Sequence, residues 1–238
     1  MNVNNIISEI TKHLAINVSL PSTKTSIKVK PINIQQVKEL IDMNSKFSYF
    51  NKGFKSQISK IILSNIIADT DVSNMVTESD VLALFALLRG KEFFKDLSID
   101  TYVESVNQIN NELFKDTLKY DNITLTLGTA SIQRGAEFDD YLYNNIKVNG
   151  SGEVINEAEV GEVYFYTDIA RWLRSLEINE VVYELDSMLI DTVLQLIKEL
   201  PVDIATKIGS FSYKLEEHIK SKLIINDTNI PFNISFFE

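Results

Sequence analysis

The chain has 238 residues, of which 45% are hydrophobic and 24% are charged, and its formal net charge at pH 7 is −10. This length suffices for one large domain or two small ones, each with a buried core. Because the sequence has no cysteine, disulfides and thiolate metal sites are excluded, and a reducing compartment is expected. We recognise no leader and no apolar run long enough to span a membrane, so we expect a soluble, unprocessed chain.

The charge is unevenly distributed along the chain. Residues 1–60 hold nine lysines and three acids, a balance of +6, while the remaining residues hold 14 basic and 30 acidic side chains, a balance of −16. Two interpretations stay open. Either the basic segment packs near the acidic remainder or is solvated, or it forms a docking surface for a protein partner. Nucleic acid is not an expected partner, because a strongly acidic chain repels phosphate.

The first part of the chain is expected to be mainly helical. Apolar residues at helical spacing predict a helix over residues 2–15, a second that Asn33 caps, and a third with Ile58, Ile62 and Ile66 on one stripe. A fourth helix, over residues 79–95, contains an uninterrupted apolar run from Val81 to Leu88 and is therefore expected inside the core. A fifth is predicted by the apolar spacing between Tyr102 and Phe114.

The segment that precedes the fourth helix imitates a calcium-binding loop. From Asp69 to Asp80, oxygen-bearing side chains stand at loop positions one, three, five and nine. Asn74 replaces the glycine that the turn needs, and Asp80 replaces the usual bidentate glutamate. We therefore interpret the segment as a solvated loop that leads to a helix cap at Thr77 or Ser79, and we expect no metal site.

A β-strand is expected near residues 24–30. Ile27 and Val29 alternate with polar residues, so one side of the strand is buried and the other faces water. Its lysines suit an exposed sheet edge, where charge prevents pairing with other chains. The apolar chain end is a second candidate surface, since an apolar terminus is either tied down or available to a partner. The candidate partner-binding residues are Lys24, Lys28, Lys30, Phe232, Phe236 and Phe237.

The second part of the chain, from residue 119, is expected to mix helices and strands. Alternation over residues 123–127 predicts a strand, and Asn149-Gly-Ser-Gly152 is a loop at which the chain can also divide. Helical spacing covers residues 164–176, residues 181–197, and Pro201 to about His218, while the tail from Leu223 to Phe237 is strand-like. The predicted fold is α+β, mainly helical with small antiparallel β elements, in two parts, 1–118 and 119–238.

The residues do not indicate catalysis. His13 and His218 lie at opposite ends of the sequence, and neither has another ligand-type residue at metal-binding spacing. Gly150-Ser-Gly152 lacks the further glycine and the lysine of a phosphate-binding loop, and no serine lies in a nucleophile elbow. Asp139 and Asp140 are adjacent rather than opposed across a cleft. We therefore expect no enzyme, no catalytic residue, no cofactor and no metal.

Three segments, taken in order, resemble one protein family. The first is Leu20-Pro-Ser22, followed by Ile27-Lys-Val-Lys-Pro31 and by Val37-Lys-Glu-Leu40 in the next helix. The second runs from Asp80 to Lys91 and consists of an apolar run, Leu-Arg, a small residue and Lys. The third is Leu200-Pro-Val-Asp-Ile-Ala-Thr-Lys-Ile208 with a Phe-Phe chain end. Together they are similar to the baseplate hub assembly proteins of T-even-like, contractile-tailed bacteriophages.

The resemblance implies a non-enzymatic role in tail assembly, as a subunit of the baseplate hub in the virion or as a chaperone-like assembly factor. The implied partners are other tail and hub proteins, and the implied location is the host cytoplasm during assembly or the tail baseplate. Because the shared motifs are packing patterns, they transfer no site residue. Some relatives carry cysteine pairs in the second half, which this chain lacks. The alternative is a small acidic intracellular hydrolase or ligand-binding regulatory domain, which a deep pocket with converging carboxylates would favour.

Overall fold

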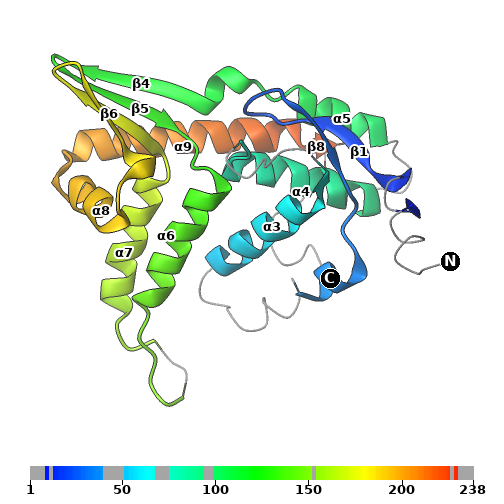
Figure 1. Cartoon of the computed structure of the whole chain (residues 1–238), viewed down its shortest axis with the longest axis horizontal. Coiled ribbons are helices and arrows are strands. Elements are labelled where there is room, and N and C mark those ends of the chain that lie inside the picture. The colour runs from blue at the N-terminus through cyan, green and yellow to red at the C-terminus, as the bar shows by residue number, and fades with distance from the viewer. Residues whose placement is uncertain are drawn as a thin grey trace. The chain divides into compact units, whose positions relative to one another are not determined.

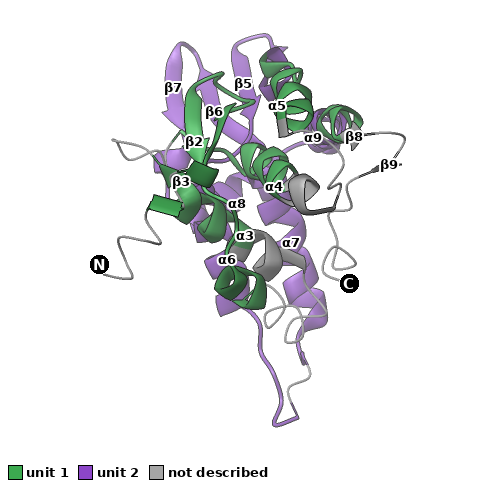
Figure 2. Ribbon diagram, turned by 90° about the vertical axis from the view of Figure 1, so that its right-hand side faces the viewer, with its two compact units in different colours: residues 1–111, 217–238 green, residues 112–216 purple. Residues whose placement is uncertain are grey.

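The computed structural model describes residues 9–10, 13–39, 51–67, 75–93, 99–151, 154–225 and 228–229. The fold is α+β and mainly helical with small antiparallel sheets, as predicted. The chain forms two compact units, which Figure 2 colours separately: residues 1–111 with 217–238, and residues 112–216. The first boundary therefore lies somewhat before the expected division at 118/119. In addition, the C-terminal segment belongs to the first unit.

The first unit contains a small antiparallel sheet in the order β1-β2-β3, with β1 (Ile16–Ser19), β2 (Ser26–Val29) and β3 (Ile66–Ile67). The alternation predicted near residues 24–30 is confirmed, because Ile27 and Val29 are buried while Ser26 and Lys28 are exposed. The expectation of an edge strand is wrong, since β2 lies between β1 and β3. Ile66, expected on the apolar stripe of the third helix, begins β3 instead.

The described helices of the first unit are residues 34–39, α3 (Asn51–Asn65), α4 (Glu78–Phe93) and α5 (Ile99–Asn107), and the last turns of α9 (Val202–Lys222) also belong to it. The core role predicted for the apolar run is confirmed, because Leu84 and Leu87 of α4 are fully buried. The helix predicted up to Phe114 ends earlier, and a 3-10 turn, η1 (Asn111–Phe114), follows it. Residues 9–10 and 13–14 are helical; the rest of the predicted N-terminal helix lies outside the described residues.

The second unit contains a four-stranded antiparallel sheet in the order β4-β5-β6-β7, with β4 (Lys115–Tyr120), β5 (Ile123–Gly128), β6 (Leu173–Ile178) and β7 (Val181–Glu184). The strand predicted over residues 123–127 is confirmed as β5. Two-residue turns close both hairpins, and Asn179 and Glu180 adopt the positive φ angles, 49° and 69°, that a type I′ turn requires. Figure 1 shows β4, β5 and β6 as one twisted ribbon of strands.

Four helices accompany this sheet: α6 (Ile132–Asn144), α7 (Glu157–Ala170), α8 (Ile190–Glu199) and α9. Leu125 and Leu127 of β5 are fully buried in a core that also holds Phe138 of α6, Ile197 of α8 and Ile208 of α9. The predicted helix after Pro201 is confirmed, and its expected inward residues are buried. The glycine-rich loop does not divide the chain. It joins α6 to α7, which run side by side within one unit (Figure 1).

The helices expected over residues 164–176 and 181–197 are wrong in part, since β6 and β7 occupy residues 173–178 and 181–184. A bulge explains the misleading spacing. Leu127 pairs with Leu173, and Leu125 pairs with Leu176. The same stretch of ladder is therefore three residue steps long in β6 and two in β5. The bulge therefore places two leucines three positions apart on one face of a strand, which imitates the period of a helix.

In the tail, Ile224–Ile225 (β8) pairs with Thr228–Asn229 (β9), in agreement with the strand-like pattern predicted there. The residues from 230 onward lie outside the described part of the chain.

Candidate functional site

The six candidate partner-binding residues do not form one described surface. Lys28 is exposed on β2, and Lys30 is half-buried just after it, where its backbone N–H donates to the carbonyl of Asn65 at 2.8 Å. Phe232, Phe236 and Phe237 lie outside the described residues.

Lys24 is engaged within the first unit. It adopts a positive φ of 58° in the turn between β1 and β2, and its Nζ donates to the carbonyls of Asn107 at 3.1 Å and Ile109 at 2.5 Å. These carbonyls lie at the C-terminal end of α5, where a cation is favoured. Burial lowers the pKa of Lys24, and the charge of Asp80 opposes this shift. Lys24 therefore stabilises the C-terminal end of α5.

Asp80 is a buried charged side chain of the first unit. It is fully buried, and its two carboxyl oxygens accept four hydrogen bonds from two residues. The N–H and Oγ of Ser22 donate at 2.8 and 2.6 Å, and the N–H and Oγ1 of Thr77 donate at 2.8 and 2.9 Å. Burial raises the pKa of Asp80, and the hydrogen bonds from Ser22 and Thr77 oppose that shift.

Thr77 and Asp80 form a capping box at the start of α4. The Asp80 N–H donates to Thr77 Oγ1 at 3.2 Å, while the Asp80 carboxylate accepts from the Thr77 N–H. Of the two caps expected from the sequence, the structure therefore uses Thr77. Asp69 to Asn74, the start of the calcium-like loop, lies outside the described residues.

The contact between Ser22 and Asp80 joins two segments of the family resemblance. Leu20 and Pro21 are buried beside Ser22, and Asp80 is the first residue of the second segment. The two sequence motifs thus form one structural device, in which the turn after β1 is hydrogen-bonded to the first turn of α4.

His218 lies near the end of α9. Its Nε2 accepts a hydrogen bond from the backbone N–H of Asn110 at 3.0 Å, so the imidazole is neutral when this bond exists. Burial and the nearby charges of Lys222 and Lys24 lower the pKa of His218. The side chain is partly exposed, and its role is to hold the turn that follows α5.

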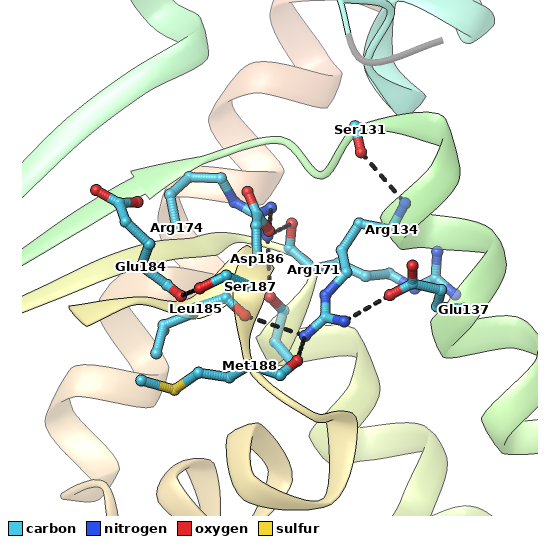
Figure 3. A network of polar contacts seen from close by, with 11 residues as sticks. Ser131, Arg134, Glu137, Arg171, Arg174, Glu184, Leu185, Asp186, Ser187 and Met188 are labelled. Carbon is cyan, nitrogen blue, oxygen red and sulfur yellow. Dashed lines mark hydrogen bonds and ion pairs between the residues drawn. The ribbon is translucent and has the colours of Figure 1, made fainter.

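In the second unit, three of the four arginines in the sequence belong to one network of polar contacts (Figure 3). Arg134 and Arg174 bind the 3-10 turn η2 (Leu185–Ser187) or the residue after it, and the backbone carbonyl of Arg171 accepts from Arg174. Arg134 of α6 is buried, and its Nη2 donates to the carbonyls of Leu185 at 3.0 Å and Met188 at 2.8 Å. Its Nη1 pairs with Glu137 at 2.5 Å, and its guanidinium lies over the ring of Phe138.

Arg171, just after α7, forms a buried ion pair with Asp139 of α6. Nη2 and Oδ1 are 2.5 Å apart, and the two residues are 7% and 3% exposed. Tyr143 is close by: burial and the charge of Asp139 raise the pKa of Tyr143 to about 12, while Arg171 opposes the shift. Asp139 and Asp140 therefore differ in environment although they are adjacent in sequence, since Asp140 is exposed.

Arg174, the extra residue of the β6 bulge, connects three elements. Its Nη1 pairs with Asp186 of η2 at 2.5 Å, and its Nη2 donates to the carbonyls of Ala170 and Arg171 at the end of α7. Gly128 leaves room for the arginine stem, since a Cβ there would lie 3.0 Å from Arg174 Cγ. The network thus holds η2 from two sides and fixes where β7 ends.

The sequence analysis missed this arginine network. The only signal in the sequence is that three of its four arginines fall between residues 134 and 174. The three guanidinium groups bind protein carboxylates, backbone carbonyls and the Phe138 ring, and these contacts favour a structural role for the network.

A polar groove of about 330 Å³ lies between residues 33–39 and α3. Amides and hydroxyls dominate its described lining, in which Glu39 is the one carboxylate. Gln36 is already bound to Asn33, Ser64 and Asn65 by hydrogen bonds of 2.9–3.2 Å. The groove is therefore not the converging-carboxylate pocket that the hydrolase alternative requires.

Among the described residues, no group of three or more His, Asp or Glu side chains is placed to hold a metal ion, and no helix has both the length and the apolar character needed to cross a membrane. Comparison with protein-family models, with curated proteins and with solved structures finds no match to this chain. The resemblance to hub assembly proteins therefore rests on the three sequence segments alone.

Proposed function

We propose that this chain is a non-enzymatic protein of phage tail assembly, either a subunit of the baseplate hub or a factor that assembles it. It acts by contact with other tail proteins. In this proposal the buried polar residues stabilise the fold, and the surface of the chain binds the other tail proteins.

The observation that carries the proposal is the contact between Ser22 and Asp80. Two of the three segments that resemble hub assembly proteins meet there, through hydrogen bonds of 2.8 and 2.6 Å. The contact gives the two segments a common structural role in this chain, and the role in assembly is carried over from the sequence resemblance by analogy.

Charge gives the proposal a second support. Residues 112–216 hold nine basic and nineteen acidic side chains, a balance of −10, whereas the rest of the chain holds fourteen of each. The second unit thus carries the whole net charge. An acidic unit attracts basic partners and disfavours self-association, as suits a protein that works with other chains.

The test is association in infected cells. The affinity-tagged chain, expressed during infection by the phage that encodes it, is expected to co-purify with hub or tail proteins, and the tag alone is the control. Mass spectrometry of purified virions then separates the two roles, because a subunit is retained in the particle and an assembly factor is not. Recovery of no tail protein under either condition would contradict the proposal.

A further inference from the structure

The two edges of the β4–β7 sheet are protected to different degrees. β4 carries Lys115, Asp116 and Lys119, and the carboxylate of Asp116 accepts the backbone N–H of Thr117 at 2.7 Å. Charge and a locally occupied N–H are devices that prevent an edge strand from pairing with another chain. β7, with the sequence Val-Val-Tyr-Glu, has no lysine and no proline, and all four of its residues are exposed.

Apolar side chains that neighbour one another across the strands form rows on the sheet, and these rows end at β7 with exposed side chains. Leu125, Leu176 and Tyr183 lie side by side on neighbouring strands, and their exposed fractions rise from 0% to 8% to 42%. In the next row Val181, beside Ile178, is 52% exposed. Cross-strand neighbours stabilise a sheet, so each row gains from one more apolar residue beyond β7.

The backbone of β7 is available at Val182. The turn that follows Ile178 makes Ile178 and Val181 a hydrogen-bonded pair, and the ladder alternates, so the N–H and C=O of Val182 point away from β6. Among the described strands, none pairs with β7 on that side. The Glu184 carbonyl already accepts from Ser187 Oγ at 2.7 Å and is therefore occupied. A further strand would accordingly begin its hydrogen bonds to β7 at Val182.

The charge beside this edge selects the partner. Glu177 pairs with Val182 across the ladder, Glu184 ends the strand, and Glu180 lies in the turn; among the described residues, no cation pairs with any of the three. The unit as a whole has a net charge of −10, so a second copy of the chain is repelled and a basic segment is attracted.

We propose that β7 is the docking edge for an extended segment of a partner protein in which apolar and basic residues alternate. The segment adds a fifth strand to the sheet. Its apolar residues continue the rows of Val181 and Tyr183, and its basic residues face Glu177 and Glu184. The arginine network holds η2 and so orders the edge before the partner arrives, which lowers the entropic cost of binding. This inference rests on the proposed function, since it specifies one contact by which the chain acts.

The probe is a capped peptide, Lys-Val-Lys-Ile-Lys-Val-Lys, titrated at up to millimolar concentration into the isotope-labelled full chain and followed by backbone amide NMR. We expect shifts in β6 and β7, and none in β4. The same peptide with glutamate in place of lysine is expected not to bind. Shifts elsewhere, equal binding of the glutamate peptide, or no shift at all would overturn the proposal.

Two variants and a matched control locate the contact. Val182→Pro removes an outward N–H without removing a ladder bond to β6, and is expected to weaken binding by about tenfold or more. Thr117→Pro makes the equivalent change at β4 and is expected to leave binding unchanged. Glu177→Lys with Glu184→Lys, at a half-buried and an exposed position, is expected to reverse the preference in favour of the glutamate peptide. Unchanged binding in the Val182→Pro and double-lysine variants would overturn the proposal.

The same variants separate this inference from the proposed function. If the wild type co-purifies with tail proteins and both β7 variants do so equally, the docking edge is wrong and the function stands. If the peptide binds at β7 but no tail protein co-purifies from infected cells, the function is wrong and the edge stands.

Discussion

Each unit buries a carboxylate, and the two carboxylates are held in opposite ways. Asp80 accepts four hydrogen bonds from the amides and hydroxyls of Ser22 and Thr77, which are neutral donors. Asp139 is paired with the guanidinium of Arg171 at 2.5 Å. Burying a charge without a partner is costly, so both sites must be satisfied, but only the second requires a buried cation.

The two buried carboxylates stabilise different kinds of structure. Asp80 fixes a local element, the first turn of α4, and connects it to the turn after β1. Asp139 and Arg171 fix the packing of α6 against the end of α7. Removal of one partner therefore destabilises the two units for different reasons. Loss of Arg171 leaves the charge of Asp139 uncompensated, whereas loss of the Asp80 carboxylate leaves neutral donors unsatisfied.

The largest expected effect is that of Arg171→Met. The change leaves Asp139 buried without its cation, so we expect the free energy of unfolding to fall by about 3–5 kcal/mol. Trp172, the only tryptophan, packs its ring against Phe211 at a centroid distance of 6.0 Å and reports on the second unit by fluorescence during urea unfolding. The double variant Arg171→Met/Asp139→Leu is the control and is expected to recover most of the loss. A single variant as stable as wild type would contradict the importance of the pair.

A smaller effect is expected from Asp80→Asn. Each carboxyl oxygen faces a fixed backbone N–H, one from Ser22 and one from Thr77, so the amide nitrogen of asparagine must meet one of them. We expect a loss of about 1–3 kcal/mol, measured by urea unfolding and by faster hydrogen exchange of the α4 amides. Ser22→Ala keeps the capping box and is expected to cost less. If Ser22→Ala cost as much as Asp80→Asn, the cap would not be the main contribution.

The smallest expected effect is the pH dependence due to His218. Its pKa in the folded chain is lowered, so its contribution to stability is complete above the unfolded pKa and is lost as the pH falls through the folded pKa. Protonation of Nε2 removes the acceptor for the Asn110 N–H and places a charge near Lys24 and Lys222. We therefore expect the urea midpoint of the first unit to decline between about pH 7 and pH 5.

His218→Gln is expected to reduce this decline, because glutamine can accept a hydrogen bond and does not titrate. His13→Gln is the matched control, since His13 is the only other histidine and is exposed. An equal decline in wild type and in His218→Gln would assign the pH dependence to other groups.

Much of the fold could be predicted from local pattern. The core position of α4, the inward face of α9, the cap at Asn33 and the alternation in β2 all follow from side chains whose spacing matches one period. The Gln36 N–H donates to Asn33 Oδ1 at 2.9 Å, as the cap prediction requires. The weakest predictions concerned β6 and β7, where a bulge and exposed apolar residues imitate a helical pattern.

The candidate site could be predicted less well, because its residues acquire their roles only by meeting others far along the chain. In the sequence, Lys24 is typical of the solvated end of a strand. In the structure, its Nζ donates to carbonyls 83 and 85 positions away. Arg134 has no sequence feature that indicates Leu185 and Met188 as acceptors. Polar contacts of this kind depend on topology, which the period of a single segment does not encode.

By itself, the sequence determined the fold class, the apolar core helix and the acidic balance, since these depend on composition and on spacing within one element. Only the tertiary structure decided that β2 is a middle strand, that Asp80 binds Ser22 and that Arg134 and Arg174 bind the η2 region. It also decided that, among the described residues, no strand pairs with the outer side of β7 and no cation pairs with the glutamates beside it. The physical reason is the same in each case. Hydrophobic periodicity is local, whereas strand order, ion pairing and the exposure of an edge are fixed by which distant segments fold against one another.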